Sequence, residues 1–170
     1  MSPNPSDIRI VSLLPSATEI VSALGLQKHL VGVSHECDYP AGVSGLPVVT
    51  STAIPKGFDS KAIDEKVREL LQTDAALYHL NVDALLALKP THIVTQAICD
   101  VCAVSAAEVE DVVCRLPGDP QVVNLELMSL QQVLDTFTLI GSATQREEDA
   151  ASVVLPCRLE SILSLRAQPG

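Results

Sequence analysis

The sequence predicts an α/β protein built on a doubly wound, mainly parallel sheet. Three observations support this fold class. Short runs of β-branched residues alternate with amphipathic segments of helical period, the helical segments begin and end at residues that cap helices, and polar loops follow the ends of the strands. The chain has 170 residues, which is long enough for one domain of this kind with its own core.

Four short apolar runs are the predicted strands of the sheet. They occupy residues 8–14, 30–33, 92–95 and 121–125, and a further run at 48–49 could add a short strand. Because the segments between these runs are long enough to contain crossover helices, the strands are expected to run parallel.

The segments that separate the strands are predicted helices. The first follows Pro15 and has the form of a capping box, with Ser16 at the N-cap and Glu19 three residues later, and Gly25 is expected to end it. Three more helices are predicted before the last strand, over residues 59–71, 82–88 and 106–113.

Two helices are predicted after the last strand. Ser129 caps the first, with Gln132 at its third position, and Gly141 is expected to end it. The second spans 147–165 and carries an apolar stripe, although Pro156 should kink or restart it. A helix of about twenty residues is roughly 30 Å long, which is the width of a small domain.

Composition and charge exclude several classes of protein. The net charge is −10 and the eleven Lys and Arg residues are scattered, whereas a nucleic-acid surface needs them clustered. No apolar run reaches the length of about 18 residues that a membrane span requires. The five cysteines are an odd number, and residues 1–7 lack the features of a secretory signal. We therefore expect a cytoplasmic protein.

Three cysteines and a histidine form the candidate metal site. Cys99 and Cys102 lie three residues apart between a predicted strand and helix, so they share one face of the first helical turn. Cys37 and His35 lie in the loop that follows the second strand. Loops at the carboxyl ends of parallel strands line one edge of the sheet, so we expect these four residues to hold zinc or an iron–sulfur cluster.

Two other interpretations of the cysteines stay open. Free cysteines are often buried and serve only to pack the core, and a Cys-x-x-Cys pair can instead carry redox chemistry. Cys114 and Cys157 fall on predicted helices and are expected in the core.

Several stretches in a fixed order resemble a known family. They are residues 10–19 (IVSLLPSATE), 24–25 (LG), 31–34 (VGVS), 38–40 (DYP) and 87–90 (ALKP). This order is similar to the amino-terminal lobe of the cobalamin and iron-siderophore class of ABC-transporter substrate-binding proteins. The stretches HECDYP and CDVCAVS resemble the cobalamin-binding sub-group, and the resemblance covers about residues 8 to 165.

The resemblance implies half of a two-lobed clamp that holds its ligand between the lobes. Residues 1–126 would form the ligand-binding lobe and 127–170 the helices that follow it, including the long joining helix, while the second lobe is absent. The implied ligand is cobalamin, another corrinoid or a related metal chelate. The implied partners are an ABC permease or a second lobe, and a homo-oligomer is a further expectation.

Eight residues are candidates for contact with this ligand. The backbone amides at the start of the first helix can hold an anionic group, as helix amino ends do. The loops at the same edge add further side chains. The candidates are Pro15, Ser16, Ala17, Thr18, Glu19, His35, Glu36 and Gln96. The resemblance also implies that Glu108 docks on arginines of the transporter.

The sequence therefore supports three hypotheses of function. The first is a non-enzymatic binding module for a corrinoid or similar metal chelate. The second is a metalloprotein with zinc or an iron–sulfur cluster, and the third is a thiol redox protein. No pairing of acid, base and substrate pocket indicates an enzyme.

Overall fold

The computed structural model describes residues 7–73, 76–96, 104–125 and 127–166, and it leaves the side chains of 106 and 158–166 undescribed. A four-stranded sheet forms the centre of the protein. Its strands are β1 (Ile10–Ser12), β2 (Leu30–Val33), β5 (His92–Thr95) and β6 (Gln121–Asn124), and they lie in the order β2-β1-β5-β6. Every pair in this sheet is parallel, which confirms the predicted fold class.

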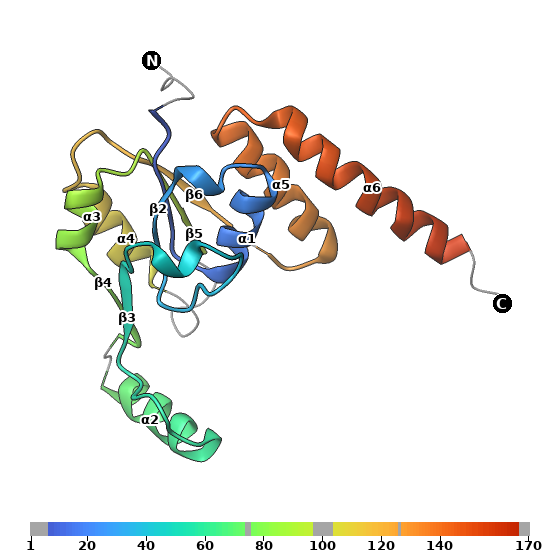
Figure 1. Ribbon diagram of the computed structural model, residues 1–170. Helices are drawn as coiled ribbons and strands as arrows, with labels where there is room; N and C mark the ends of the chain where they lie inside the picture. Colours follow the sequence, from blue (N-terminus) through green and yellow to red (C-terminus); the bar gives the residue numbers. More distant parts are fainter. Residues whose placement is uncertain (1–6, 74–75, 97–103, 126, 167–170) are drawn as a thin grey trace.

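Helices cover both faces of the sheet. Figure 1 shows α3 (Val82–Leu88) and α4 (Ala106–Val113) on one side, and α1 (Pro15–Ala23), α5 (Leu130–Ala143) and α6 (Glu147–Arg166) on the other. Alternate residues of each strand point to opposite faces. The buried side chains accordingly form two clusters, one containing Ile10 and Val94 and the other containing Val11 and Ile93.

A two-stranded antiparallel ribbon extends from the sheet at the ends of the parallel strands. It pairs β3 (Thr50–Thr52) with β4 (Tyr78–Leu80), and α2 (Ser60–Gln72) lies beyond it, below the body in Figure 1. No residue of α2 is buried. The predicted short strand at 48–49 is only a single parallel bridge, between Val48 and Val33. The strand β4 was not predicted, because three residues are too few to show a strand period.

The buried ring of His92 ties the start of β5 to its neighbours. Nδ1 lies 2.8 Å from the hydroxyl of Thr91, which also accepts a hydrogen bond from the amide of Arg9 in front of β1. Nε2 lies 2.9 Å from the carbonyl oxygen of Ala143 at the end of α5, so Nε2 carries the proton. Burial lowers the pKa of His92, and the hydrogen bond with the carbonyl oxygen of Ala143 partly offsets this by raising the pKa.

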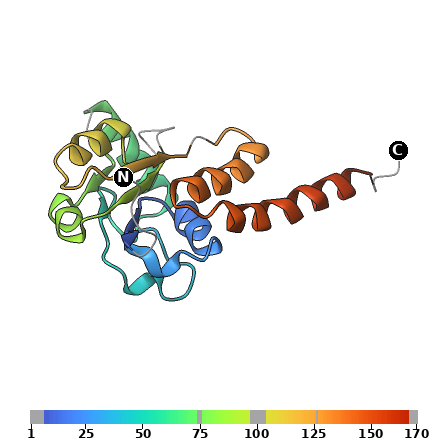
Figure 2. The same ribbon diagram turned by 90° about the horizontal axis from the view of Figure 1, so that it is seen from above.

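The two last helices form a hairpin whose contact depends on Gly141. Ser129 caps α5 as predicted, but the prediction that Gly141 ends the helix is wrong, because α5 continues to Ala143. A side-chain carbon added at Gly141 would lie 2.7 Å from the Cβ of Ala150 in α6 and 2.9 Å from the carbonyl oxygen of Arg146. The glycine therefore permits close packing and does not stop the helix. α6 continues through Pro156 and projects from the body in Figure 2.

Replacing Gly141 with alanine should lower the free energy of unfolding by about 1–3 kcal/mol, because the added methyl group overpacks the contact with Ala150 and Arg146. Alanine is the better helix former, so helix propensity alone predicts the opposite sign. Urea unfolding measures the difference. The matched control is Gly45→Ala, where the new carbon meets no atom within 4 Å. A Gly141→Ala variant as stable as the parent would refute the packing role.

Candidate functional site

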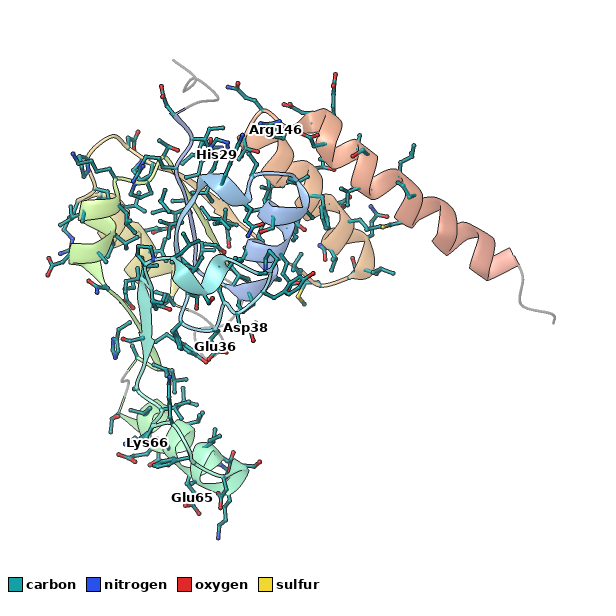
Figure 3. All side chains as sticks on the ribbon, viewed as in Figure 1. His29, Glu36, Asp38, Glu65, Lys66 and Arg146 are labelled. Carbon is teal, nitrogen blue, oxygen red and sulfur yellow. The ribbon has the colours of Figure 1, made fainter. Side chains whose placement is uncertain are left out.

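The carboxyl ends of the parallel strands bring several predicted residues to one edge. β1 leads into α1, β2 leads into the loop 34–40, and β5 leads to Gln96. Figure 3 shows Glu36 and Asp38 at this end of the body, on the side of the ribbon and α2, with His29 and Arg146 at the opposite end. The start of α1 and the His35 loop are therefore neighbours. Their convergence follows from the parallel order of the strands.

The first helix begins differently from the prediction. Leu14 is its N-cap, with an extended backbone, and Pro15 is its first residue, so Ser16 lies inside the helix. The predicted Ser16 and Glu19 capping box is therefore wrong. The physical reason is Pro15, whose fixed φ favours the first helical position and which has no N–H to satisfy. No side chain caps this helix. In the first turn, Pro15 has no N–H, Ala17 and Thr18 are buried, and the amide of Thr18 donates to the carbonyl oxygen of Leu14. The exposed Ser16 therefore offers the amide that a ligand can reach.

Behind the start of α1, hydroxyl groups connect buried side chains. The hydroxyl of Thr18 donates a hydrogen bond to the oxygen of Ser12 at 2.8 Å, and Ser12 in turn donates to the carbonyl oxygen of Leu14. The thiol of Cys37 lies 3.1 Å from the hydroxyl of Thr18. The contact between Cys37 and Thr18 joins the loop after β2 to the helix after β1.

Cys37 is buried against this group of hydroxyls. Burial raises the pKa of its thiol, with a smaller contribution from the charges of Asp38 and Glu36, while hydrogen bonds with Thr18 and Ser34 act in the opposite direction. A raised pKa disfavours the thiolate that metals bind. Cys99 and Cys102 lie outside the described residues, so the three-cysteine site stays a prediction. Within the part of the chain that is described, no group of three or more potential ligand residues could hold a metal.

The imidazole of His35 is held by hydrogen bonds on one side only. Its Nδ1 lies 2.6 Å from the hydroxyl oxygen of Thr50, and the same oxygen accepts the backbone amide of His35 at 3.0 Å. The hydroxyl of Thr50 donates to Ser34 at 3.1 Å. The ring of Tyr78 packs beside the imidazole, with 5.7 Å between the ring centres. Nε2 is buried, lies 3.4 Å from a carboxylate oxygen of Glu36 and makes no hydrogen bond with any residue that the structure describes.

A small cavity of about 80 Å³ opens beside His35. Its lining comes from five segments that meet at this edge of the protein. It consists of Leu13, Leu14, Pro15, Ser34, His35, Glu36, Thr50, Tyr78 and Val104. Ser34, Thr50 and Tyr78 were not among the predicted site residues. The only signal for Ser34 was its position directly after a strand, and the sequence has no signal that brings Thr50 and Tyr78 to His35.

The other predicted ligand-contacting residues are distributed over different surroundings. Ser16 and Glu19 line a separate groove between α1 and α5, while Ala17 and Thr18 are buried. Gln96 is half-buried after β5. The eight ligand candidates thus do not share one surface, although Pro15, His35 and Glu36 line the same cavity.

Glu108 has a structural partner that the prediction of transporter docking did not anticipate. One oxygen of its carboxylate accepts the amide of Leu80 in β4 at 2.9 Å. The backbone amide of Glu108 donates a hydrogen bond to the hydroxyl oxygen of Ser105, the N-cap of α4. Glu108 therefore joins α4 to the ribbon, and its docking role stays a prediction.

Two further features lie away from this edge. Cys114 and Cys157 were expected in the core but are exposed, Cys114 as the C-cap of α4 and Cys157 on α6. A larger groove of about 720 Å³ lies at the opposite edge, between the start of β5, β6 and the end of α5. Ligands of open parallel sheets bind at the carboxyl ends of the strands, so we place the site beside His35 despite the smaller volume there.

Comparison with solved structures identifies the architecture. The chain matches a possible iron-binding, periplasmic solute-binding protein from Staphylococcus epidermidis with 26% identity and a TM-score of 0.66, covering 95% of this chain and 51% of that one. It is built like one lobe of a periplasmic binding protein. The periplasmic heme-binding protein HutB of Vibrio cholerae matches with 21% identity and a TM-score of 0.64, over 95% of this chain and 51% of that one. No protein-family model and no curated protein matches the sequence.

The vitamin B12-binding protein BtuF of Vibrio cholerae is a third match, with 22% identity, a TM-score of 0.55 and coverage of 94% and 51%. The chain thus spans about half the length of these structures. All three are described as periplasmic, which does not support the expected cytoplasmic location. Among the described residues, no helix is both long enough and apolar enough to cross a membrane.

Alkylation should distinguish the environments of two cysteines. Iodoacetamide at pH 8 should label Cys37 at least about tenfold more slowly than Cys114, because Cys37 is buried with a raised pKa and only the exposed thiolate reacts. Mass spectrometry of the digested protein measures the two rates within one sample. Denaturing the protein in urea should remove the difference. Equal rates in the folded protein would contradict the buried position of Cys37.

Proposed function

We propose that this chain is a ligand-binding module that recognises a corrinoid or a related metal chelate at the carboxyl edge of its sheet. The observation that carries the proposal is the meeting of the uncapped start of α1 and the His35 loop at that edge. The fold supports it, because solved structures with the same lobe are described as binding heme, iron or vitamin B12.

The start of α1 suits the acidic groups of such a ligand. Its first-turn amides have no side-chain cap, and no acidic residue lies in the first turn. A helix amino end carries a partial positive charge and attracts carboxylate or phosphate groups. The net charge of −10 and the carboxylate of Glu36 beside the cavity both repel an anionic ligand, and the partial positive charge of this helix end opposes that repulsion.

The small volume of the cavity limits how a large ligand could lie at this edge. A volume of about 80 Å³ is far below the 300–1,000 Å³ or so of ordinary ligand pockets. A macrocycle would therefore lie across the rim, against the apolar side chains of Leu14 and Pro15, with one group of the ligand or the protein filling the cavity. This geometry leaves the other face of the macrocycle to a second contact surface.

A second lobe and a permease complete the proposal. The matching structures are about twice as long as this chain, and α6 projects away from the body in Figures 1 and 2. One lobe supplies only part of the contacts, so binding by this chain alone should be weak, with a Kd on the order of micromolar or above. In the described part of the chain, no specific observation favours the zinc, iron–sulfur or thiol redox alternatives.

A charge placed at the edge of the sheet should reduce binding. Pro15→Glu puts a carboxylate at the cavity rim, where it occupies the ligand's position and repels acidic groups, yet a first-turn glutamate suits a helix start. Equilibrium dialysis against hemin and aquocobalamin should show a loss of about tenfold or more in affinity for whichever ligand the parent binds.

The matched control is Gln121→Glu, which adds the same charge at the exposed start of β6, on the opposite edge. This variant should bind like the parent. Equal losses in both variants would indicate an effect of net charge alone. Failure of the parent to bind either ligand at millimolar concentration would refute the proposed function.

A further inference from the structure

The helix α2 carries an apolar stripe that the described residues leave largely exposed. None of its 13 residues is buried. The stripe consists of Ile63, Val67, Leu70 and Leu71, which recur at helical spacing, and Ile63 and Leu71 are 39% and 48% exposed. Isolated helices shorter than about 12–15 residues are marginal in water, and most of their stability in proteins comes from packing of the apolar face. The stripe therefore indicates a surface that acquires a partner.

Ion pairs occupy the polar side of α2. Lys61 and Glu65 lie 3.8 Å apart, and Asp64 and Arg68 lie 2.9 Å apart, each pair separated by one helical turn. Such pairs stabilise a helix in solvent by a small amount. Because these charges are matched within the helix, the apolar stripe is the feature of α2 that is left for another molecule.

The stripe faces the candidate binding site. Figure 3 shows Glu65 on the side of α2 that is turned away from the body. Residues two positions apart lie on nearly opposite sides of an α-helix, because each residue turns the helix by about 100°. Ile63 and Val67 are both two positions from Glu65. They therefore lie on the side of α2 that is turned toward the carboxyl edge of the sheet.

The ribbon that carries α2 is continuous with the cavity beside His35. Thr50 in β3 and Tyr78 in β4 both line this cavity, and β3 leads to α2 through a turn at Gly57, whose φ is +87°. A cavity of about 80 Å³ holds only a small part of a large ligand. The rest of the ligand must project from the edge, on the side where Figure 1 shows α2.

The segment between β3 and β4 also differs from the rest of the chain in charge. Residues 53–77 contain four of the eleven basic residues and five of the twenty-one acidic residues, so their net charge is −1. The remaining 145 residues carry a net charge of −9. An acidic ligand that is repelled by the body is therefore repelled much less by the segment that contains α2.

Resting on the proposed function, we infer that the apolar stripe of α2 is a second contact surface for the bound chelate. The ligand lies between the carboxyl edge of the body and α2, with the stripe against its apolar face. This arrangement favours chelates with a broad apolar macrocycle, such as heme or a corrinoid. Small hydrophilic iron chelates offer the stripe no apolar surface to cover, so they gain nothing from it.

Two double variants test the contact. Ile63→Gln with Leu71→Gln makes the stripe polar, keeps the net charge and introduces a residue with good helix propensity. Equilibrium dialysis should show about tenfold weaker binding of hemin or aquocobalamin, whichever the parent binds. The matched control is Lys61→Gln with Glu65→Gln, which places two glutamines on the polar side of the same helix without changing the net charge. This control should bind like the parent.

Ferric citrate tests the class of ligand, because it is an anionic iron chelate without an apolar face. The parent should bind it at least about tenfold more weakly than the macrocycle. Hydrogen exchange of the parent then gives a readout that needs no variant. A saturating macrocycle should slow the exchange of the amides in residues 60–72, and ferric citrate at the same concentration should not.

The outcomes distinguish this inference from the proposed function. If the macrocycle binds but neither the stripe variant nor the exchange of α2 responds, the contact with α2 is wrong while the proposed function stands. If α2 is already protected without ligand and the protein sediments as a dimer, a second copy covers the stripe and the inference is also wrong. If the parent binds neither hemin nor aquocobalamin, the proposed function is itself wrong. Weaker binding by the stripe variant alone, with ligand-dependent protection of α2, would support both.

Discussion

The parallel pairing of β1 with β2 and β5 is the constraint on which the candidate site depends. These hydrogen bonds place β1 between its two neighbours, so that all three strands end at one edge of the sheet. The chain segments after β1 and β2 are about twenty residues apart in sequence, yet their ends lie side by side. A change that shifted either strand would separate α1 from the His35 loop.

Hydrogen bonds of buried hydroxyl groups hold together the segments that meet at this edge. Ser12 and Thr18 connect the end of β1 to α1 and to Cys37, while Ser34 and Thr50 connect the end of β2 to the ribbon and to His35. A hydroxyl can donate one hydrogen bond and accept others, so a single hydroxyl can hold several neighbouring groups in place. The result is an imidazole whose orientation is held by Thr50 before any ligand arrives.

The sequence predicted the elements whose signals are local. The four sheet strands, the bounds of α4 and the cap at Ser129 follow from β-branched runs, period and capping residues, and all are confirmed. The start of α1 was misplaced because two local signals competed, and Pro15 at the first position prevailed over Ser16 as a cap.

The features that the sequence did not predict depend on tertiary contacts. Gly141 has the sequence signal of a helix end, but in the structure it allows α6 to pack closely against α5. No local sequence pattern reveals this contact. Thr50 and Tyr78 lie 28 positions apart in the sequence. Both reach His35 only because the two strands of the ribbon pair with each other beside the loop after β2. The signal for a polar site was present in His35, whereas the partners that orient it were not predictable.

The location of the binding site is tested most directly by nuclear magnetic resonance of the ¹⁵N-labelled protein, titrated with aquocobalamin. The site described above predicts that the amides of residues 14, 16–18 and 34–36, at the carboxyl edge, shift first and furthest. The amide signals of residues 118–119, 121–122 and 142–145, around the larger groove at the opposite edge, should not shift. Shifts confined to the opposite edge would contradict the placement of the ligand site at the carboxyl ends of the strands.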